Sequence, residues 1–142
     1  MPIKQITPAL AFAGTAEQAI HLYEKALGAK VENLMRFGDA AAMGQSIPDE
    51  HKDGIMHSVL RIGEGPIMVM DAPPGTPLST DGKVQIALDF DDVAEMTRSF
   101  DALAAGGEVT MPLQDAFWGA KFGMLTDAFG IRWMFNCQTK QA

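Results

Sequence analysis

The chain of 142 residues contains an internal repeat. When the sequence is moved by 78 positions without a gap, the segment 16–31 (AEQAIHLYEKALGAKV) falls on the segment 94–109 (AEMTRSFDALAAGGEV), with five identities. Upstream of these segments, Leu10 and Phe12 fall on Leu88 and Phe90. Chance similarity between two amphipathic helices is the alternative, but the matching upstream residues favour a duplicated unit. Two facing copies can enclose a shared cleft, where small molecules commonly bind.

The first copy is predicted to open with a strand and a capped helix. The strand lies in the apolar segment 6–14 (ITPALAFAG). Thr15 is a favourable N-cap, Gln18 has the spacing of a capping box, and Gly28 is placed to end the helix. The apolar residues at helical intervals, which predict one buried face, are Ala16, Ile20, Tyr23 and Leu27.

The second copy repeats this pattern with different residues. Asp92 takes the N-cap position, Glu95 completes the capping box, and Gly106 or Gly107 ends the helix. Its apolar stripe consists of Val93, Met96, Phe100 and Leu103. A pattern that keeps the caps while the other residues change is typical of a folding unit, because caps contribute about 1 kcal/mol each.

Three further strands are predicted after each helix, and short turns join the last two of each set as hairpins. The predicted strands are 30–38 (KVENLMRFG), 57–63 (HSVLRIG), 66–72 (PIMVMDA), 108–114 (EVTMPLQ), 120–127 (AKFGMLTD) and 131–136 (IRWMFN). The fold class is therefore predicted to be α+β, as a tandem pair of βαβββ units.

We expect residues 1–142 to form a single domain, since units of about 70 residues bury little core alone. The units span about 3–72 and 84–138. Two segments do not repeat: 39–54 (DAAAMGQSIPDEHKDG), which we interpret as a lid or rim, and 73–83 (PPGTPLSTDGK), which we interpret as a plain linker. Loops of this length in a compact domain are mobile or functional.

Composition limits the classes of partner. A net charge of −7, with 11 basic and 18 acidic residues and no basic run, disfavours nucleic acid, which needs clustered Lys and Arg. No apolar stretch approaches the ~18 residues of a membrane span. The single cysteine, Cys137, cannot form an internal disulfide and is expected to be a buried strand residue. We therefore expect a cytoplasmic protein with no nucleic-acid or membrane partner.

The repeated unit resembles that of the vicinal oxygen chelate superfamily, which includes glyoxalase I, fosfomycin- and bleomycin-resistance proteins and extradiol dioxygenases. The segments 6–31, 57–74 and 117–136 resemble its PhnB-like branch, whose members are often labelled 3-demethylubiquinone-9 3-methyltransferase. The most specific element is Phe117-Trp118-Gly119, followed by the turn 126–130 (TDAFG). The resemblance implies curved half-barrel sheets around a shared cleft, and a homodimer.

The resemblance also implies where a divalent metal would be held. Metal-dependent members use four His, Glu or Gln side chains from the first and last strands of each unit. The corresponding positions in this chain are Pro8, Met68 (or Val69), Gln85 (or Ile86) and Met134. Among the four first choices, only Gln85 offers a hard donor, and one neutral amide does not hold a divalent ion. We therefore predict no metal site and no cofactor.

Among the other polar and aromatic residues, His57 and Trp118 are the candidates for ligand binding. His57 begins a strand expected to line the cleft, and Trp118 lies on a loop where an aromatic ring commonly stacks on a ligand. Packing over the end of the barrel is an equally good interpretation of Trp118. His21 is interpreted as an exposed helix residue, His51 as part of a solvated charge cluster, and Trp133 as core.

The function predicted from sequence is metal-free binding of a small apolar or aromatic molecule. The predicted ligand-binding residues are His57, Met68, Gln85, Trp118 and Met134, with the methionines forming an adaptable apolar lining. One alternative is a metal-dependent lyase, isomerase or dioxygenase of the same superfamily. Another is a methyltransferase acting on a ubiquinone precursor, which is disfavoured because no glycine-rich turn leads from a strand into a helix. A dimer with a vestigial pocket remains a fourth possibility.

Overall fold

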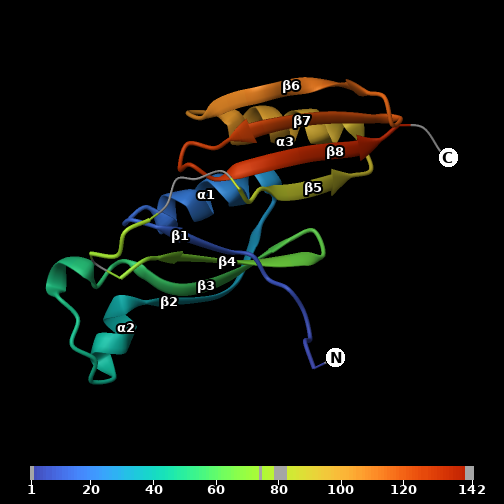
Figure 1. Cartoon of the computed structure of the whole chain (residues 1–142). Coiled ribbons are helices and arrows are strands. Elements are labelled where there is room, and N and C mark those ends of the chain that lie inside the picture. Colours follow the sequence, from blue (N-terminus) through green and yellow to red (C-terminus); the bar gives the residue numbers. More distant parts are fainter. Residues whose placement is uncertain (1, 74, 79–82, 140–142) are drawn as a thin grey trace. The chain divides into compact units, whose positions relative to one another are not determined.

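The computed structural model of the chain describes residues 2–73, 75–78 and 83–139 (Figure 1). The chain divides into two compact units, Met1–Ser79 and Thr80–Ala142. Each unit contains one four-stranded mixed sheet and one long helix, which confirms the predicted α+β class and the repeated βαβββ order. The segment predicted as a linker includes residues 74 and 79–82, which lie outside the described residues. None of the described helices is long and apolar enough to cross a membrane.

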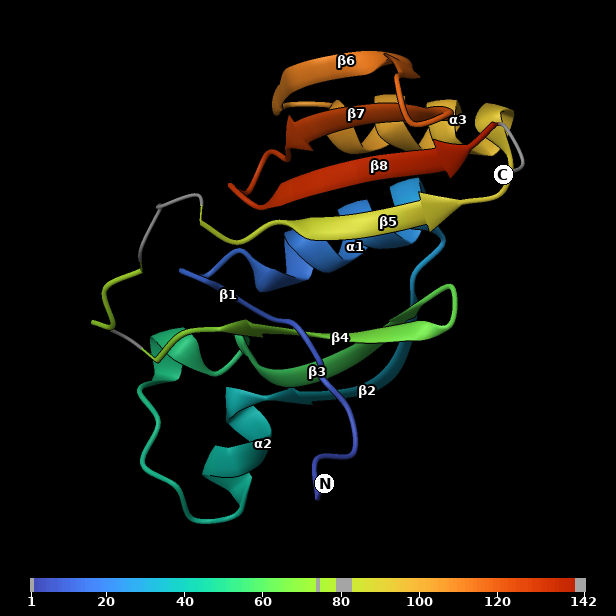
Figure 2. The same cartoon turned by 45° about the vertical axis from the view of Figure 1, so that its right-hand side comes forward.

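The first unit forms a sheet in the order β1-β4-β3-β2. β1 is parallel to β4, and the other neighbours are antiparallel (Figure 2). Its elements are β1 (Ala9–Phe12), α1 (Ala16–Leu27), β2 (Lys30–Arg36), α2 (Phe37–Ala42), η1 (Asp49–His51), β3 (Ile55–Ile62) and β4 (Gly65–Asp71).

The second unit forms a sheet in the corresponding order, β5-β8-β7-β6. β5 is parallel to β8, and α3 lies along one face of the sheet (Figure 1). Its elements are β5 (Ile86–Phe90), α3 (Val93–Ala104), β6 (Glu108–Ala116), β7 (Ala120–Thr126) and β8 (Arg132–Gln138).

Buried apolar residues hold each helix against its sheet. In α1 the buried positions are Ala16, Ala19, Ile20, Tyr23 and Ala26, whereas Leu27 is only half-buried. In α3 they are Met96, Phe100 and Leu103, and Phe100 packs edge-on against Phe135 of β8 with ring centroids 5.0 Å apart. The predicted helix faces are therefore correct apart from Leu27 and Val93, which are only half-buried. In α1 the buried stripe follows the small residues Ala19 and Ala26 instead.

The two helices begin in chemically different ways. Asp92 caps α3 as predicted, since its Oδ2 accepts a hydrogen bond from the Glu95 N–H at 2.8 Å. Thr15 occupies the N-cap position of α1, but its side chain makes no capping hydrogen bond. Instead, Asp71 at the end of β4 accepts hydrogen bonds from the N–H groups of Gly14 and Ala16, at 2.9 and 3.0 Å.

Alignment of the two units in three dimensions requires a gap of one residue on each side of the helix. The first strands keep the offset of 78, since Ala9 and Ala87 occupy equivalent positions opposite Met68 and Met134. The strands after the helices, β2 and β6, begin at Lys30 and Glu108 and keep it too. The helices are offset by 77, from the N-cap Thr15 to the N-cap Asp92. The first unit has one more residue before its helix, and the second unit has one more after it. The identities within the helices, such as Ala16 and Ala94, are therefore not structural equivalents.

The non-repeating segment 39–54 is more ordered than a loop. Asp39 Oδ2 accepts a hydrogen bond from the Arg36 N–H at 2.9 Å, which fixes the start of α2. The predicted strand 30–38 correspondingly ends at Arg36, and a short 3-10 helix, η1, follows α2. The apolar run Ala40–Ala42 explains why a helical turn forms here, because alanine has the highest helix propensity.

Candidate functional site

The sheet of each unit has one face against its own helix, and we call the opposite face the open face. Side chains alternate along each strand, so the open face of β8 carries the residues between the buried Trp133, Phe135 and Cys137. The register places two rows of residues across the second sheet. The first row is Ala87, Met134, Met124 and Met111, and the second row is Asp89, Asn136, Phe122 and Gln114.

Trp118 lies in the turn between β6 and β7, beside the second row. Its ring meets that of Phe122 edge-on, with centroids 5.4 Å apart and planes at 73°. Its indole Nε1–H donates a hydrogen bond to Asn136 Oδ1 at 3.4 Å, and Asn136 Nδ2 donates to Asp89 Oδ1 at 3.3 Å. Although it is anchored in this way, Trp118 remains 47% exposed. The result is an aromatic surface next to an amide and a carboxylate.

The open face of the first sheet is less polar. Its first row is Ala9, Met68, Val59 and Asn33, which matches the first row of the other unit position by position. Ala11 pairs with Met70, and His57 pairs with Met35. His57 and Met68 are both half-buried. Of the predicted ligand-binding residues, His57 and Met68 lie on this sheet, while Met134 and Trp118 belong to the other unit.

The side chains at the family's metal positions do not fit a hard divalent ion. Met68 and Met134 lie across from Ala9 and Ala87. The register therefore moves the first-strand positions one residue from Pro8, and two residues from Gln85 or one from the alternative Ile86. Thioether and methyl groups offer no oxygen or nitrogen ligand. Gln85 is exposed and precedes β5. Among the described residues, no group of three or more His, Cys, Asp or Glu side chains could hold a metal ion.

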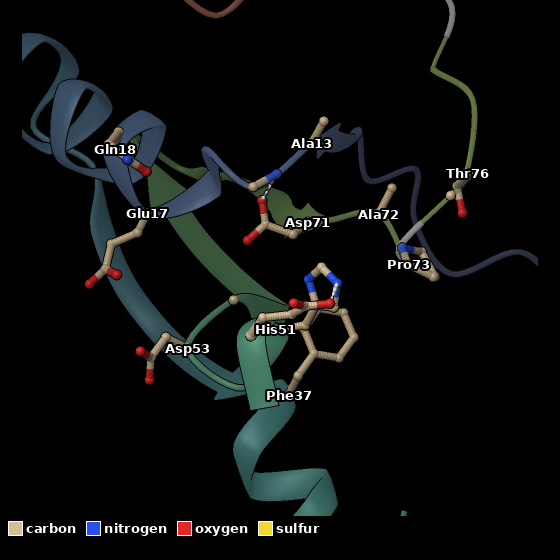
Figure 3. A pocket seen from close by; sticks show the side chains of 14 residues that line it. Ala13, Glu17, Gln18, Phe37, His51, Asp53, Asp71, Ala72, Pro73 and Thr76 are labelled. Atoms are coloured by element: carbon tan, nitrogen blue, oxygen red, sulfur yellow. Dashed lines mark hydrogen bonds and ion pairs between the residues drawn. The ribbon is translucent and has the colours of Figure 1, made fainter. Parts of the chain in front are cut away.

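The first unit also contains a pocket of about 610 Å³, which the sequence did not reveal. It lies where α1 begins and β4 ends, and His51 and Phe37 lie close together on its wall (Figure 3). The lining residues are Ala13, Gly14, Glu17, Gln18, Phe37, Glu50, His51, Asp53, Gly54, Asp71, Ala72, Pro73, Gly75 and Thr76. The segment 39–54, interpreted as a rim, contributes four of these residues, which are Glu50, His51, Asp53 and Gly54. Phe37 lies just before that segment.

Asp71 holds the inner wall of this pocket together. Besides the two N–H groups at the start of α1, its carboxylate accepts the Ile55 N–H at 2.9 Å. The residue is 6% exposed, so three backbone donors replace the water that the buried carboxylate loses. A single acidic residue after the apolar run 67–70 is the sequence signal, but only the fold shows which donors it meets.

An ion pair lies on another part of the pocket. Arg36 donates to both carboxylate oxygens of Glu17, at 3.1 and 2.8 Å, and to the Asp53 carbonyl at 2.6 Å. The hydrogen bonds from Arg36 lower the pKa of Glu17 below its ordinary value, and its positive charge acts in the same direction. Glu17 is therefore committed to tying α1 to the end of β2.

The remaining predicted residues fall into simple classes. His21 is exposed and bonds Glu24 at 3.2 Å, as expected for a helix-surface histidine. Trp133 and Cys137 are buried, as predicted, and burial raises the pKa of the Cys137 thiol, with added effects from Asp92 and Asp91. His51 pairs with Glu50 of its charge cluster but is half-buried on the pocket wall rather than fully solvated. Pro73, Gly75 and Thr76 of the predicted linker also line the pocket.

Comparison with known proteins gives consistent matches along the whole chain. The profile of the Glyoxalase/Bleomycin resistance protein/Dioxygenase superfamily matches residues 5–135. The chain is 36% identical over 143 residues to protein YjdN of Escherichia coli strain K12, which covers 96% of this chain and 97% of YjdN. The crystal structure of protein PA1353 from Pseudomonas aeruginosa matches with a TM-score of 0.84 and 40% identity, covering 97% of this chain and 100% of that one.

A more distant structure shares the fold. The PhnB protein from Bacillus cereus, whose description proposes 3-demethylubiquinone-9 3-methyltransferase activity, matches with a TM-score of 0.73. The match covers 94% of this chain and 99% of that one. At 21% identity, this likeness shows the fold alone.

Proposed function

Since this chain belongs to the Glyoxalase/Bleomycin resistance protein/Dioxygenase superfamily, we propose that it binds a small, largely apolar or aromatic molecule without a divalent metal. The PhnB protein from Bacillus cereus shares this fold, in line with the resemblance to the PhnB-like branch. The proposed ligand contacts are on the open faces of the sheets. Trp118 supplies a stacking surface, Met68 and Met134 supply adaptable apolar contacts, and His57 supplies a polar group.

The observation that carries this proposal is the setting of Trp118. An indole on a turn would ordinarily pack down or move freely, but this one is held by Asn136 and Phe122 while 47% of it stays exposed. A fixed aromatic ring loses little conformational freedom when a ligand stacks on it, which favours binding. The neighbouring Phe117, 97% exposed and 5.1 Å from the Trp118 centroid, adds to the aromatic surface.

The composition of the family's metal positions supports the metal-free part. Met68, Met134 and the alanines opposite them are soft or apolar, so they suit an organic ligand better than a hard cation. Gln85, an exposed side chain just before β5, contributes a further polar contact. Homodimer formation and a cytoplasmic location belong to the same proposal and rest on the family resemblance and the lone cysteine.

Two measurements test the proposal. We expect 1-naphthalenemethanol to bind the purified protein in calorimetry, with unchanged affinity after chelation and dialysis. We expect Trp118→Ala to weaken this binding about tenfold or more, since stacking on an aromatic side chain is worth about 1–3 kcal/mol. Trp118→Phe keeps a stacking ring and should stay within about threefold.

The outcomes against the proposal are equally specific. A stoichiometric divalent ion, whose removal abolishes binding, would favour the metal-dependent alternative. Micromolar binding of S-adenosylmethionine would favour the methyltransferase alternative. A Trp118→Ala protein that keeps the fluorescence of buried Trp133 and binds as tightly as the parent would show that Trp118 takes no part in binding.

A further inference from the structure

The hydrogen bonds at Trp118 have a fixed direction. An indole N–H can only donate, so the Asn136 amide must turn its oxygen toward Trp118. Its NH2 group then faces Asp89, to which it donates at 3.3 Å. A carboxylate can only accept when ionised, so the chain of donors runs from Trp118 through Asn136 and ends at Asp89.

Asp89 has acceptor capacity left over. An ionised carboxylate offers about four lone-pair sites, and the hydrogen bond from Asn136 occupies one of its oxygens. In the part of the chain that the structure describes, no Lys, Arg or His side chain forms an ion pair with Asp89, which is exposed. A ligand can therefore reach this carboxylate without displacing a partner.

The charges around Asp89 favour a cation. Asp91 and Asp92 follow it at the same end of β5, and both are exposed. Arg132 is on the open face of β8, but it lies four residues from Asn136, roughly 13 Å along the strand and beyond a Debye length at physiological ionic strength. Lys121 lies beside Phe122 on β7, and alternation directs it to the opposite face.

The other unit lacks this arrangement. Ala11 of the first unit occupies the position equivalent to Asp89. Ala11 pairs with Met70, two residues after Met68, and Asp89 pairs with Asn136, two residues after Met134. The corresponding methyl and thioether groups accept no strong hydrogen bond. At this pair of equivalent positions, the second unit alone therefore carries a carboxylate, next to Trp118.

We propose that Asp89, held by Asn136, selects an aromatic ligand that carries a protonated amine one or two atoms from its ring. The ring would stack on Trp118, and the ammonium group would donate to Asp89. A single amide separates the indole nitrogen from the carboxylate, which limits how far the amine can lie from the ring. This inference rests on the proposed function and names the ligand class for the same site.

Three probes with the same ring test it by calorimetry at pH 7: 1-naphthylmethylamine, 1-naphthalenemethanol and 1-naphthaleneacetate. We expect the amine to bind the parent protein at least about tenfold more tightly than the alcohol, since a hydrogen bond between an ammonium group and a carboxylate is stronger than a neutral one. We expect the acetate to bind most weakly, because its negative charge is repelled by Asp89. Asp89→Asn should weaken the amine about tenfold and change the alcohol less than about twofold.

Asp91→Asn is the matched control, because it removes one exposed carboxylate from the same end of β5. We expect it to change amine binding less than about threefold. Equal losses in the two variants, or equal binding of amine and alcohol, would overturn the role of Asp89 while leaving the proposed function in place. Failure of all three probes to bind the parent protein would overturn both.

Discussion

The two units have the same strand order but differ in where their carboxylate side chains lie and what they bind. In the first unit, Asp71 at the end of β4 turns inward and binds the start of its helix. The corresponding position of the second unit, three residues after Met134 as Asp71 is three after Met68, is the buried Cys137. The second helix is capped by its own Asp92. Its open face carries Asp89, where the first unit has Ala11.

This difference indicates that the length of the connection before the helix decides whether a carboxylate on the last strand can accept hydrogen bonds from the start of the helix. The extra residue before α1 brings Gly14, at φ +92, and its N–H into reach of Asp71. The second unit has no such residue, so its helix must be capped locally. The position on β8 that corresponds to Asp71 is the buried thiol of Cys137, and the carboxylate of Asp89 lies on the open face instead.

The largest effect is expected from removing Asp71, the buried carboxylate that holds the start of α1 in the first unit. Asp71→Ala leaves three backbone N–H groups without their acceptor, which we expect to lower the free energy of unfolding of the first unit by about 3 kcal/mol or more. Urea unfolding followed by Tyr23, the only tyrosine, reports on this unit. Trp133 fluorescence reports on the second unit and should change less.

Asp101→Ala is the matched control, since Asp101 is an exposed carboxylate on α3. It should leave both transitions within about 0.5 kcal/mol of the parent. A Tyr23 transition that Asp71→Ala leaves in place would mean that water replaces the carboxylate from the side of the pocket, and that the two units differ less than their hydrogen bonds suggest.

The next effect is expected at the extra residue of the second unit, after α3. A Cβ on Gly107 would lie 2.2 Å from the Thr126 carbonyl oxygen and 2.8 Å from the Asp127 carbonyl carbon. Because both are backbone atoms, Gly107→Ala must displace the chain, and we expect a loss of about 2–3 kcal/mol. Trp133 is the probe, since its Nε1–H donates to Asp127 at 2.9 Å.

Gly65→Ala is the control in the first unit, where the nearest atom to an added Cβ is 3.8 Å away. It should be nearly neutral. A Gly107→Ala protein as stable as the parent would show that the β7–β8 turn moves at little cost in stability to accept the added Cβ.

The smallest effect is expected at the ion pair of the first unit. Arg36→Gln removes the hydrogen bonds that lower the pKa of Glu17, so that pKa should rise toward its ordinary value, as followed by carboxyl NMR. A carboxyl group whose pKa is lower in the folded than in the unfolded protein stabilises the fold at pH values above its unfolded-state pKa. This stabilisation is lost as the pH falls through its folded-state pKa. The destabilisation by Arg36→Gln should therefore be complete at pH 7 and disappear in acid.

The magnitude should be at most about 1 kcal/mol, because both side chains are partly exposed. Arg98→Gln is the control in the second unit, where Arg98 pairs with Glu95 on the surface of α3. It should leave stability unchanged at either pH. A destabilisation by Arg36→Gln that persists unchanged in acid would assign the effect to packing or to the bond with the Asp53 carbonyl.

Patterns within a few residues were predictable because their causes are local. The helix stripes, Gly28 in its left-handed conformation at φ +66, and the Asp92 cap follow from spacing and side-chain chemistry. Thr15 occupies the predicted N-cap position, but its side chain forms no capping hydrogen bond, and the carboxylate at the start of α1 comes from the distant Asp71. The helix at Phe37–Ala42 was missed because its helical turn is short and sits among polar residues.

Residue types and their spacing were enough to predict the duplicated order of strands and helices, most of the buried helix faces and the lack of hard metal ligands at Met68 and Met134. The tertiary structure was needed to show that the helices are shifted by one residue relative to the strands when the two units are aligned. It was also needed to show that Asp71 accepts a hydrogen bond from Gly14, 57 positions away. It also decided that Trp118, Asn136 and Asp89 form one chain of hydrogen bonds. The physical reason is that these contacts join separate strands, whose register depends on the packing of the whole unit.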